Sequence, residues 1–278
     1  KGKNYKFQYS PSNGSVDNVR RVGLGDFATA WGHVVQSYQS WYGVGLFKKD
    51  GINRDFRVVA NVRSQTQIVA VLARSPIKSF SDMKGKVVNL LSKGSGSNVN
   101  CTNIFKGLGL LDQIKPRYLG FAASGRALGD RQIDVFCSAG APFKIPALTE
   151  LSLRKPVRYI SMTAAEQKKL TSAYKFYAPT TIPVQKDVKG MTEPARSFAY
   201  PVFWYAHKQM SDDAIYNMVK IAATPANLKK LASTAGYWKT LSGDFEALKA
   251  HKMWVHPAAA RYWKERGVNV PAELIKGF

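Results

Sequence analysis

The chain of 278 residues is short of cysteine, histidine and acidic residues, and each shortage narrows the functions open to it. Its two cysteines and four histidines show no zinc-ligand spacing. No apolar run approaches the roughly 20 residues that span a bilayer. Nothing at Lys1 resembles a signal peptide. The composition therefore predicts no structural metal and no membrane span, and we expect any export signal to have been removed.

Acidic residues number 18 against 41 lysines and arginines, which leaves a formal net charge of +23. Such an excess suits a polyanionic partner such as nucleic acid. The basic residues, however, are spread along the chain in doublets such as Lys48-Lys49, and no zinc-finger, RNA-binding or basic-zipper motif accompanies them. We therefore expect no nucleic-acid partner, and the charge favours an anionic solute or an anionic membrane surface.

The chain does contain a repeated alternation of strand and helix patterns. Hydrophobic residues make up 45% of it, enough for two modest domains. Apolar runs of strand length, at 67–73 and 133–136, alternate with helical segments at 99–107 and 164–172, and a first strand is expected over 5–9. This alternation predicts an α/β fold with mostly parallel sheets flanked by helices.

The most informative segment is residues 86–98, which predicts a buried strand, a turn of small residues and the start of a helix. Gly94 and Gly96 allow a sharp turn and a close approach of a ligand. Ser97 or Asn98 is the expected helix cap. Free N–H groups at such a helix start bind small anions, although an ordinary strand-to-helix turn would look the same.

Three turns of small residues are expected at one edge of the predicted sheets. They comprise residues 12–15, 94–97 and 138–140. Open α/β sheets bind their ligands beyond the carboxyl ends of the strands. Taken together, the three turns predict the lining of a ligand cleft.

The two cysteines also fall near that edge. Cys101 lies in the first turn after the Gly-Ser-Gly-Ser segment, and Cys137 ends the strand predicted over 133–136. Parallel strands would bring both close enough for a disulfide in an oxidising compartment, and two buried free thiols are the alternative. A free thiol would permit an enzyme on the same scaffold, although no histidine lies in a predicted cleft segment to serve as its base.

Four landmarks fall in order along nearly the whole chain. Residues 12–18 read Ser-Asn-Gly-Ser-Val-Asp-Asn, and residues 34–37 read Val-Val-Gln-Ser. Residues 77–97 carry Lys-Ser-Phe-Ser-Asp-Met-Lys-Gly-Lys ahead of the Gly-Ser-Gly-Ser turn, and residues 256–267 read His-Pro-Ala-Ala-Ala-Arg-Tyr-Trp-Lys-Glu-Arg-Gly. In this order and spacing the chain resembles the TAXI-type solute-binding proteins of TRAP transporters.

The resemblance implies an exported, periplasmic receptor that captures an organic acid or amino acid and delivers it to the TRAP permease. It implies no catalysis and no cofactor, and we expect a monomer. It also implies two α/β lobes that close over a cleft by hinge motion. Lobe one would comprise residues 1–69 and 190–278, and lobe two residues 70–189. The first strand and loop of the family would precede the point at which this chain begins.

The resemblance also selects candidate ligand-binding residues. Arg63 stands near the first crossing between lobes, where an arginine is a natural clamp for a carboxylate, although a solvated surface arginine is the alternative. Gln36 and Ser37 offer hydrogen bonds to a carboxyl group or, alternatively, cap the following helix. Trp31 and Tyr38 are the aromatic residues expected nearest the cleft, with core packing as their alternative. Ile182 replaces the tyrosine usual in the family.

The complete expected set is Ser12, Asn13, Gly14, Ser15, Trp31, Gln36, Ser37, Arg63, Gly94, Ser95, Gly96, Ser97, Ala139, Gly140, Thr180, Thr181 and Ile182. The basic surplus, Arg63 and the helix starts together favour a carboxylate solute. A basic polyanion binder and a thiol enzyme remain the alternative functions.

Overall fold

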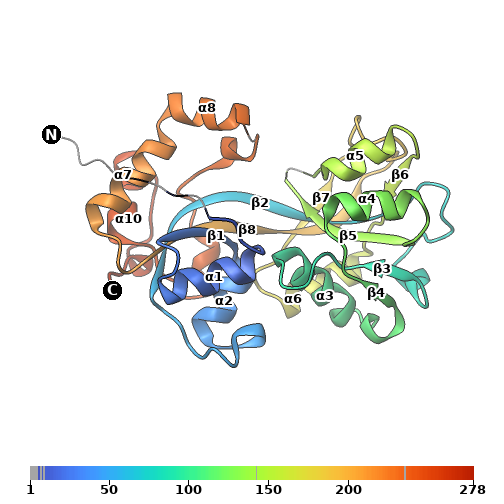
Figure 1. Ribbon diagram of the computed structural model, residues 1–278, viewed down its shortest axis with the longest axis horizontal. Coiled ribbons are helices and arrows are strands. Elements are labelled where there is room, and N and C mark those ends of the chain that lie inside the picture. Colours follow the sequence, from blue (N-terminus) through green and yellow to red (C-terminus); the bar gives the residue numbers. More distant parts are fainter. Residues whose placement is uncertain (1–5, 7, 9, 142, 235) are drawn as a thin grey trace. The chain divides into compact units, whose positions relative to one another are not determined.

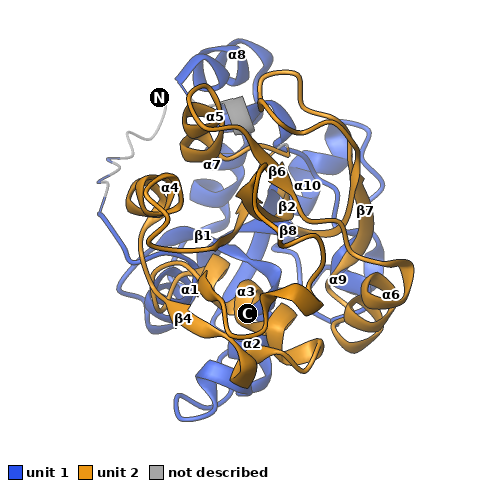
Figure 2. Cartoon of the chain, turned by 90° about the vertical axis from the view of Figure 1, so that its right-hand side faces the viewer, with its two compact units in different colours: residues 1–63, 201–278 blue, residues 64–200 orange. Residues whose placement is uncertain are grey.

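The computed structural model describes the chain apart from residues 1–5, 7, 9, 142 and 235, and the chain divides into two compact units (Figure 2). Unit 1 comprises residues 1–63 and 201–278, and unit 2 comprises residues 64–200. The chain passes between the units inside two long strands, β2 (Phe56–Leu72) and β8 (Ala195–His207) (Figure 1). The lobe limits expected from the sequence are 69/70 and 189/190, six and eleven residues from the limits of the two units. Of the strand predicted over 5–9, residues 5, 7 and 9 lie outside the described residues.

Unit 1 combines the N-terminal helices with the C-terminal part of the chain. Its elements are α1 (Ser15–Leu24), β1 (Thr29–His33), α2 (Val34–Tyr42), the 3-10 turn η1 (Gly45–Phe47), α7 (Asp212–Ala223), α8 (Pro225–Thr234), the 3-10 turn η4 (Gly236–Thr240), α9 (Glu246–Lys249), α10 (Pro257–Glu265) and the 3-10 turn η5 (Ala272–Leu274). β1 pairs antiparallel with β8, in a register that sets His33 opposite Val202. Ser211 caps α7 by accepting a hydrogen bond from the amide of Ala214 at 3.3 Å.

Large aromatic side chains fill the core of unit 1. Trp41, Phe56 and Tyr205 are each at most 1% exposed. The Phe56 ring lies edge-on to both neighbours, 5.6 Å from Trp41 and 5.3 Å from Tyr205. Edge-to-face packing of this kind adds to the burial of each ring, so α2, β2 and β8 are held together by apolar contact.

A buried arginine fastens the end of the chain to β2. Arg57 is 3% exposed and donates hydrogen bonds to the carbonyl oxygens of Lys276 at 3.0 Å and Gly277 at 2.7 Å. Its guanidinium lies over the rings of Trp254 and Phe278, 4.8 and 4.2 Å from their centroids. Burial lowers the pKa of Arg57 to about 10, because the charged form loses solvation.

Unit 2 contains most of the strand–helix alternation. Its elements are the 3-10 turn η2 (Ser81–Met83), β3 (Val87–Asn89), α3 (Gly96–Gly107), the 3-10 turn η3 (Leu111–Gln113), β4 (Lys115–Arg117), α4 (Phe121–Gly129), β5 (Val135–Gly140), α5 (Pro146–Ser152), β6 (Val157–Tyr159), α6 (Ala164–Ala173) and β7 (Ala178–Ile182). Local signals explain the helix starts. Pro146 occupies the first turn of α5, and Thr163 with Glu166 forms a capping box on α6.

The α/β class is confirmed, but the expectation of mostly parallel sheets is wrong. β3 pairs in parallel with β4 and β5, as the connecting helices predict. β2 pairs antiparallel with both β5 and β6, and β8 pairs antiparallel with β1 and β7. The reason is that β2 and β8 are continuous strands that pass between the units, β2 into unit 2 and β8 out of it. They are not joined to their neighbours by helical crossovers, so nothing imposes the parallel direction on them.

Two further elements differ from the sequence reading. β2 is one continuous strand, although Arg63, Ser64 and Gln65 interrupt its apolar pattern. The small residues at 138–140, expected as a turn, form the end of β5. No helix in the described part of the chain is long and apolar enough to cross a membrane.

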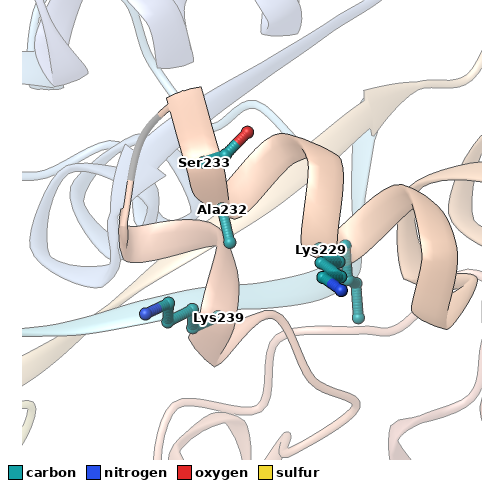
Figure 3. A pocket seen from close by; sticks show the side chains of 5 residues that line it. Lys229, Ala232, Ser233 and Lys239 are labelled. Carbon is teal, nitrogen blue, oxygen red and sulfur yellow. The ribbon is translucent and has the colours of Figure 1, made fainter.

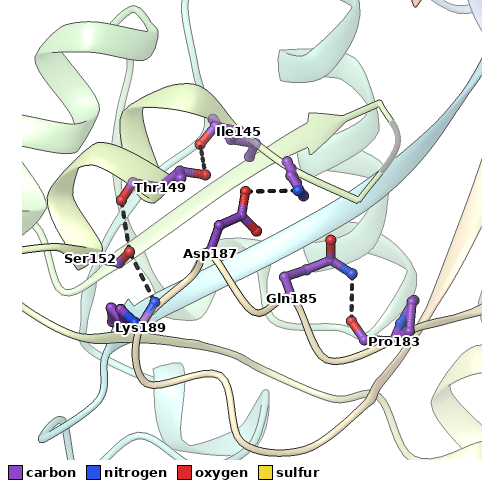
Figure 4. A network of polar contacts seen from close by, with 8 residues as sticks. Ile145, Thr149, Ser152, Pro183, Gln185, Asp187 and Lys189 are labelled. Carbon is purple, nitrogen blue, oxygen red and sulfur yellow. Dashed lines mark hydrogen bonds and ion pairs between the residues drawn. The ribbon is translucent and has the colours of Figure 1, made fainter.

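Polar contacts hold the segment after β7 against α5 (Figure 4). Ser152 accepts a hydrogen bond from the amide of Lys189 at 3.0 Å, and Lys144 pairs with Asp187 at 2.7 Å. Gln185 donates its side-chain amide to the carbonyl oxygen of Pro183 at 2.7 Å. The side-chain nitrogen of Gln185 is thus engaged within its own turn.

Candidate functional site

In unit 1 the first turns of α1 and α2 meet. Ser15, the first residue of α1, accepts a hydrogen bond at 3.3 Å from the amide of His33, which precedes α2. Among the described residues, neither Gly14 nor His33 provides a side-chain cap to its helix. Because helix N-termini carry partial positive charge and unpaired N–H groups, two of them side by side favour an anion.

The next residues of α2 are buried beside that junction. Ser37 donates a hydrogen bond to the carbonyl oxygen of His33 at 3.2 Å. Gln36 has no exposed surface, and neither its side-chain oxygen nor its nitrogen has a hydrogen-bond partner among the described residues. A buried amide without partners costs free energy, so Gln36 is the side chain here that gains most from a polar ligand.

The remaining candidates of unit 1 lie in the segment before α1 and on the strands β1 and β2. Trp31 is half-buried on β1, with its ring 4.7 Å from that of Trp238 in an edge-on contact. Ser12 and Asn13 are exposed, and Gly14 has a φ of 102°, which favours glycine. Arg63 is half-buried and is the last residue of β2 in this unit.

One carboxylate stands at the start of α1. Asp17 lies in its first turn and accepts a hydrogen bond from the amide of Asn13 at 3.1 Å. Its negative charge already interacts with the positive end of the α1 dipole. The first turn of α2 contains no acidic residue. An anionic ligand is therefore better accommodated on the α2 side of the junction, where Gln36 lies.

In unit 2 the Gly-Ser-Gly-Ser turn opens α3, as predicted, but with a different cap. Ser95 accepts a hydrogen bond from the amide of Asn98 at 3.1 Å. The expected caps Ser97 and Asn98 lie inside the helix, because α3 begins at Gly96 rather than at 99. Gly94 has a φ of 81°, which explains the glycine before the cap.

The structure contains the disulfide between Cys101 and Cys137, with their Cα atoms 5.9 Å apart. The parallel pairing of β3 and β5 brings α3 to β5, as the sequence argument required. Neither sulfur is a free thiolate in this form, so the thiol enzyme lacks the nucleophile that it needs at these positions.

Gln67 is a buried polar residue that the apolar pattern predicts only as the first residue of a strand. Its side-chain nitrogen lies 3.3 Å from each disulfide sulfur and 2.5 Å from the carbonyl oxygen of Ser138. Its side-chain oxygen has no partner among the described residues. The one sequence signal that could have identified Gln67 is that a polar residue begins the otherwise apolar run 67–73.

The other candidates of unit 2 lie on strands. Ala139 pairs in register with Gln67, so the structure brings this candidate next to the disulfide. At Gly140 an added Cβ would overlap the carbonyl oxygen of Lys144, which explains the glycine by close packing. Ile182, on β7, is 1% exposed and belongs to the apolar core of the unit.

β7 replaces the turn that was expected over 177–183. Thr180 and Thr181 lie on this strand, opposite Ser197 and Arg196 of β8. Thr181 is exposed, and the carbonyl oxygen of Thr180 accepts a hydrogen bond from Gln167 at 3.0 Å. The β-branched threonines suit a strand, which the prolines on either side of them obscured in the sequence.

A surface pocket of about 420 Å³ lies in unit 1 between α8 and η4 (Figure 3). None of the candidate residues lines it. Its lining is Leu228, Lys229, Ala232, Ser233 and Lys239. Across the described ranges, no group of three or more histidine, cysteine or acidic residues is placed to hold a metal ion.

Comparison with known proteins gives a family and a fold. Residues 1–267 match the NMT1-like family. Among solved structures, a protein from Xanthomonas citri bound to ATP is 12% identical in sequence, with a TM-score of 0.51. The match covers 90% of this chain and 82% of the Xanthomonas protein. The periplasmic aliphatic sulphonate-binding protein SsuA from Escherichia coli is 15% identical with a TM-score of 0.45, covering 92% and 81%. A binding protein of an ABC phosphonate transporter from Pseudomonas aeruginosa is 11% identical with a TM-score of 0.49, covering 92% and 76%.

Proposed function

The chain belongs to the NMT1-like family, and we propose that it is a periplasmic receptor that captures a small organic anion for a membrane transporter. The observation that carries the proposal is the meeting of two helix N-termini beside the buried amide of Gln36, which has no hydrogen-bond partner in the described part of the chain. A binding protein needs this kind of preformed polar group, whereas catalysis would also need a nucleophile or an acid–base pair.

The chemistry of the junction favours a carboxylate. The N–H groups at the start of α2 would donate to its oxygens, and the Gln36 amide would add one further hydrogen bond. Arg63 would contribute a bidentate ion pair if the solute reaches it. The net charge of +23 attracts anions from a distance, which raises the rate of capture. Among carboxylates, dicarboxylates and amino acids come first, followed by aromatic acids.

The transporter class is the finer part of the proposal. The four landmarks support a TAXI-type receptor that serves a TRAP permease. The SsuA and phosphonate-binding structures belong to other binding proteins, and at 11–15% identity their likeness supports the fold alone. Co-expression with candidate permeases distinguishes the classes. A TRAP permease that transports only in the presence of this chain supports the proposal, and stimulation of an ABC permease contradicts it.

The binding proposal is tested by replacing Gln36 with methionine, which keeps the volume and removes the amide. Thermal unfolding is followed with and without organic acids, since a ligand that binds the folded state raises the melting temperature. We expect Gln36→Met to unfold at the same or a higher temperature than the wild type when no solute is present, because no hydrogen bond is lost. We expect its affinity for the solute to fall by about tenfold to a hundredfold.

Gln113→Met is the matched control. Gln113 is exposed in unit 2, so this substitution also removes an amide but leaves the proposed junction intact. Its solute-induced shift should equal that of the wild type. An unchanged shift in Gln36→Met would contradict the role of this residue. A shift only with oligonucleotides, lost steeply with salt, would favour the polyanion alternative instead.

A further inference from the structure

The loop that follows α2 folds against the end of α1 and forms one corner of unit 1 (Figure 1). Asn53 donates its side-chain amide to the carbonyl oxygen of Gly23 at 2.9 Å. Arg20 of α1 pairs with Asp50 of the loop at 2.7 Å. These two contacts hold residues 43–54 beside the last turn of α1.

Four large apolar side chains of this corner are exposed to solvent. Leu24 and Ile52 are each 66% exposed, Leu46 is 52% exposed and Val44 is 42% exposed. Leu24 follows Gly23 and Ile52 precedes Asn53, so the hydrogen bond between these neighbours brings the two parts of the chain together. Exposed single apolar residues are common, but a group of four in one small corner indicates a contact surface. We call these four residues the apolar corner.

Basic residues surround the apolar corner. The segments 20–24 and 43–54 contain five cationic side chains and one acidic side chain. The acidic residue, Asp50, is already paired with Arg20. Lys48 and Lys49 are exposed and follow directly on Phe47, which is 1% exposed and anchors η1 in the core. Among the described residues no carboxylate pairs with Lys48 or Lys49, so the corner combines exposed apolar surface with positive charge.

We propose that the apolar corner docks this protein on an anionic lipid surface. Its leucine, isoleucine and valine side chains enter the headgroup region, and the surrounding lysines and arginines lie against lipid phosphates. A nucleic acid would use the charge but offers no acyl region for the four apolar side chains. The inference goes beyond solute capture and does not depend on it. It gives the exposed basic residues of this corner a role at the lipid surface.

The test is co-sedimentation of the whole chain with vesicles. One set contains phosphatidylglycerol and phosphatidylethanolamine, and the other contains only zwitterionic phosphatidylcholine. We expect binding to the anionic vesicles alone. Leu46→Asp combined with Ile52→Asp should abolish it, because both charges would have to enter the headgroup region. Lys48→Gln combined with Lys49→Gln should weaken it about 30-fold, since each basic residue near an anionic surface contributes a factor of about five.

Leu153→Asp is the matched control, because Leu153 is 67% exposed in unit 2 and stands next to Arg154 and Lys155. This variant should bind the anionic vesicles like the wild type. Equal losses in Leu153→Asp and in the corner variants would show that overall charge is responsible, which overturns the proposal. Absence of binding to anionic vesicles would overturn it as well. All variants change exposed side chains, and unaltered melting temperatures would verify that they fold.

Discussion

Removal of the disulfide tests how strongly this bond stabilises the folded state of unit 2. The bridge joins Cys101 and Cys137 across a sequence separation of 36 residues. A loop of that length restricts the unfolded chain enough to stabilise the folded state by about 4 kcal/mol on the chain-entropy account. Gln67 keeps its hydrogen bond to the carbonyl oxygen of Ser138, so no new unpaired donor is created when the sulfurs are replaced. The loss should therefore be close to the entropic value.

The variant is Cys101→Ala with Cys137→Ala, measured by thermal unfolding beside the wild type with and without a thiol reductant. For a unit of this size, about 4 kcal/mol corresponds to a decrease of roughly 10 °C in melting temperature. The wild type should lose about this much when reduced, and the variant should not respond to reductant. A wild type whose melting temperature is the same in both conditions would show that the disulfide does not stabilise the fold, and two titratable thiols in the unreduced, denatured protein would show that it does not form.

Three other predictions concern stability. Gly140→Ala should lower the free energy of unfolding by about 3 kcal/mol, because its Cβ would overlap a backbone carbonyl oxygen, and a loss below about 1 kcal/mol in denaturant titrations would contradict this. Ser95→Ala should cost about 1 kcal/mol while Ser97→Ala costs less, and the reverse order would contradict the observed cap. Burial lowers the pKa of three histidines below 6.5 in the folded state, so the unfolded chain takes up their protons more readily as the pH falls below 6.5. The melting temperature should therefore be lower at pH 5 than at pH 8, and equal values would contradict this. These histidines are His207, His251 and His256.

Much of unit 2 could be predicted from local patterns. The parallel pairing of β3 with β4 and β5 follows from the helices that join them. That pairing places the start of α3 near β5, and so made a disulfide one of two open alternatives before the structure was known. The Gly-Ser-Gly-Ser turn was identifiable because glycines and a capping serine act within a few residues of one another.

The rest depends on contacts between distant parts of the sequence. β2 stays continuous through Arg63 because its neighbours supply the pairing that its local pattern lacks. The contact between Ser15 and His33 spans 18 residues of sequence, so no local pattern contains it. Ile182 was chosen because it stands where the family usually has a tyrosine, yet its apolar side chain is buried in the core. The surroundings of Gln67 could not be predicted either, because the two cysteine sulfurs that contact its side chain come from distant parts of the sequence.

Isothermal titration of the whole chain with dicarboxylates, amino acids, aromatic acids, sulfonates and phosphonates measures directly whether the protein binds a small organic anion. We expect saturable binding of one carboxylate class at one site per chain, with little dependence on salt and with weakened binding in Gln36→Met. Absence of binding across the panel, together with salt-sensitive binding of oligonucleotides, would contradict this expectation.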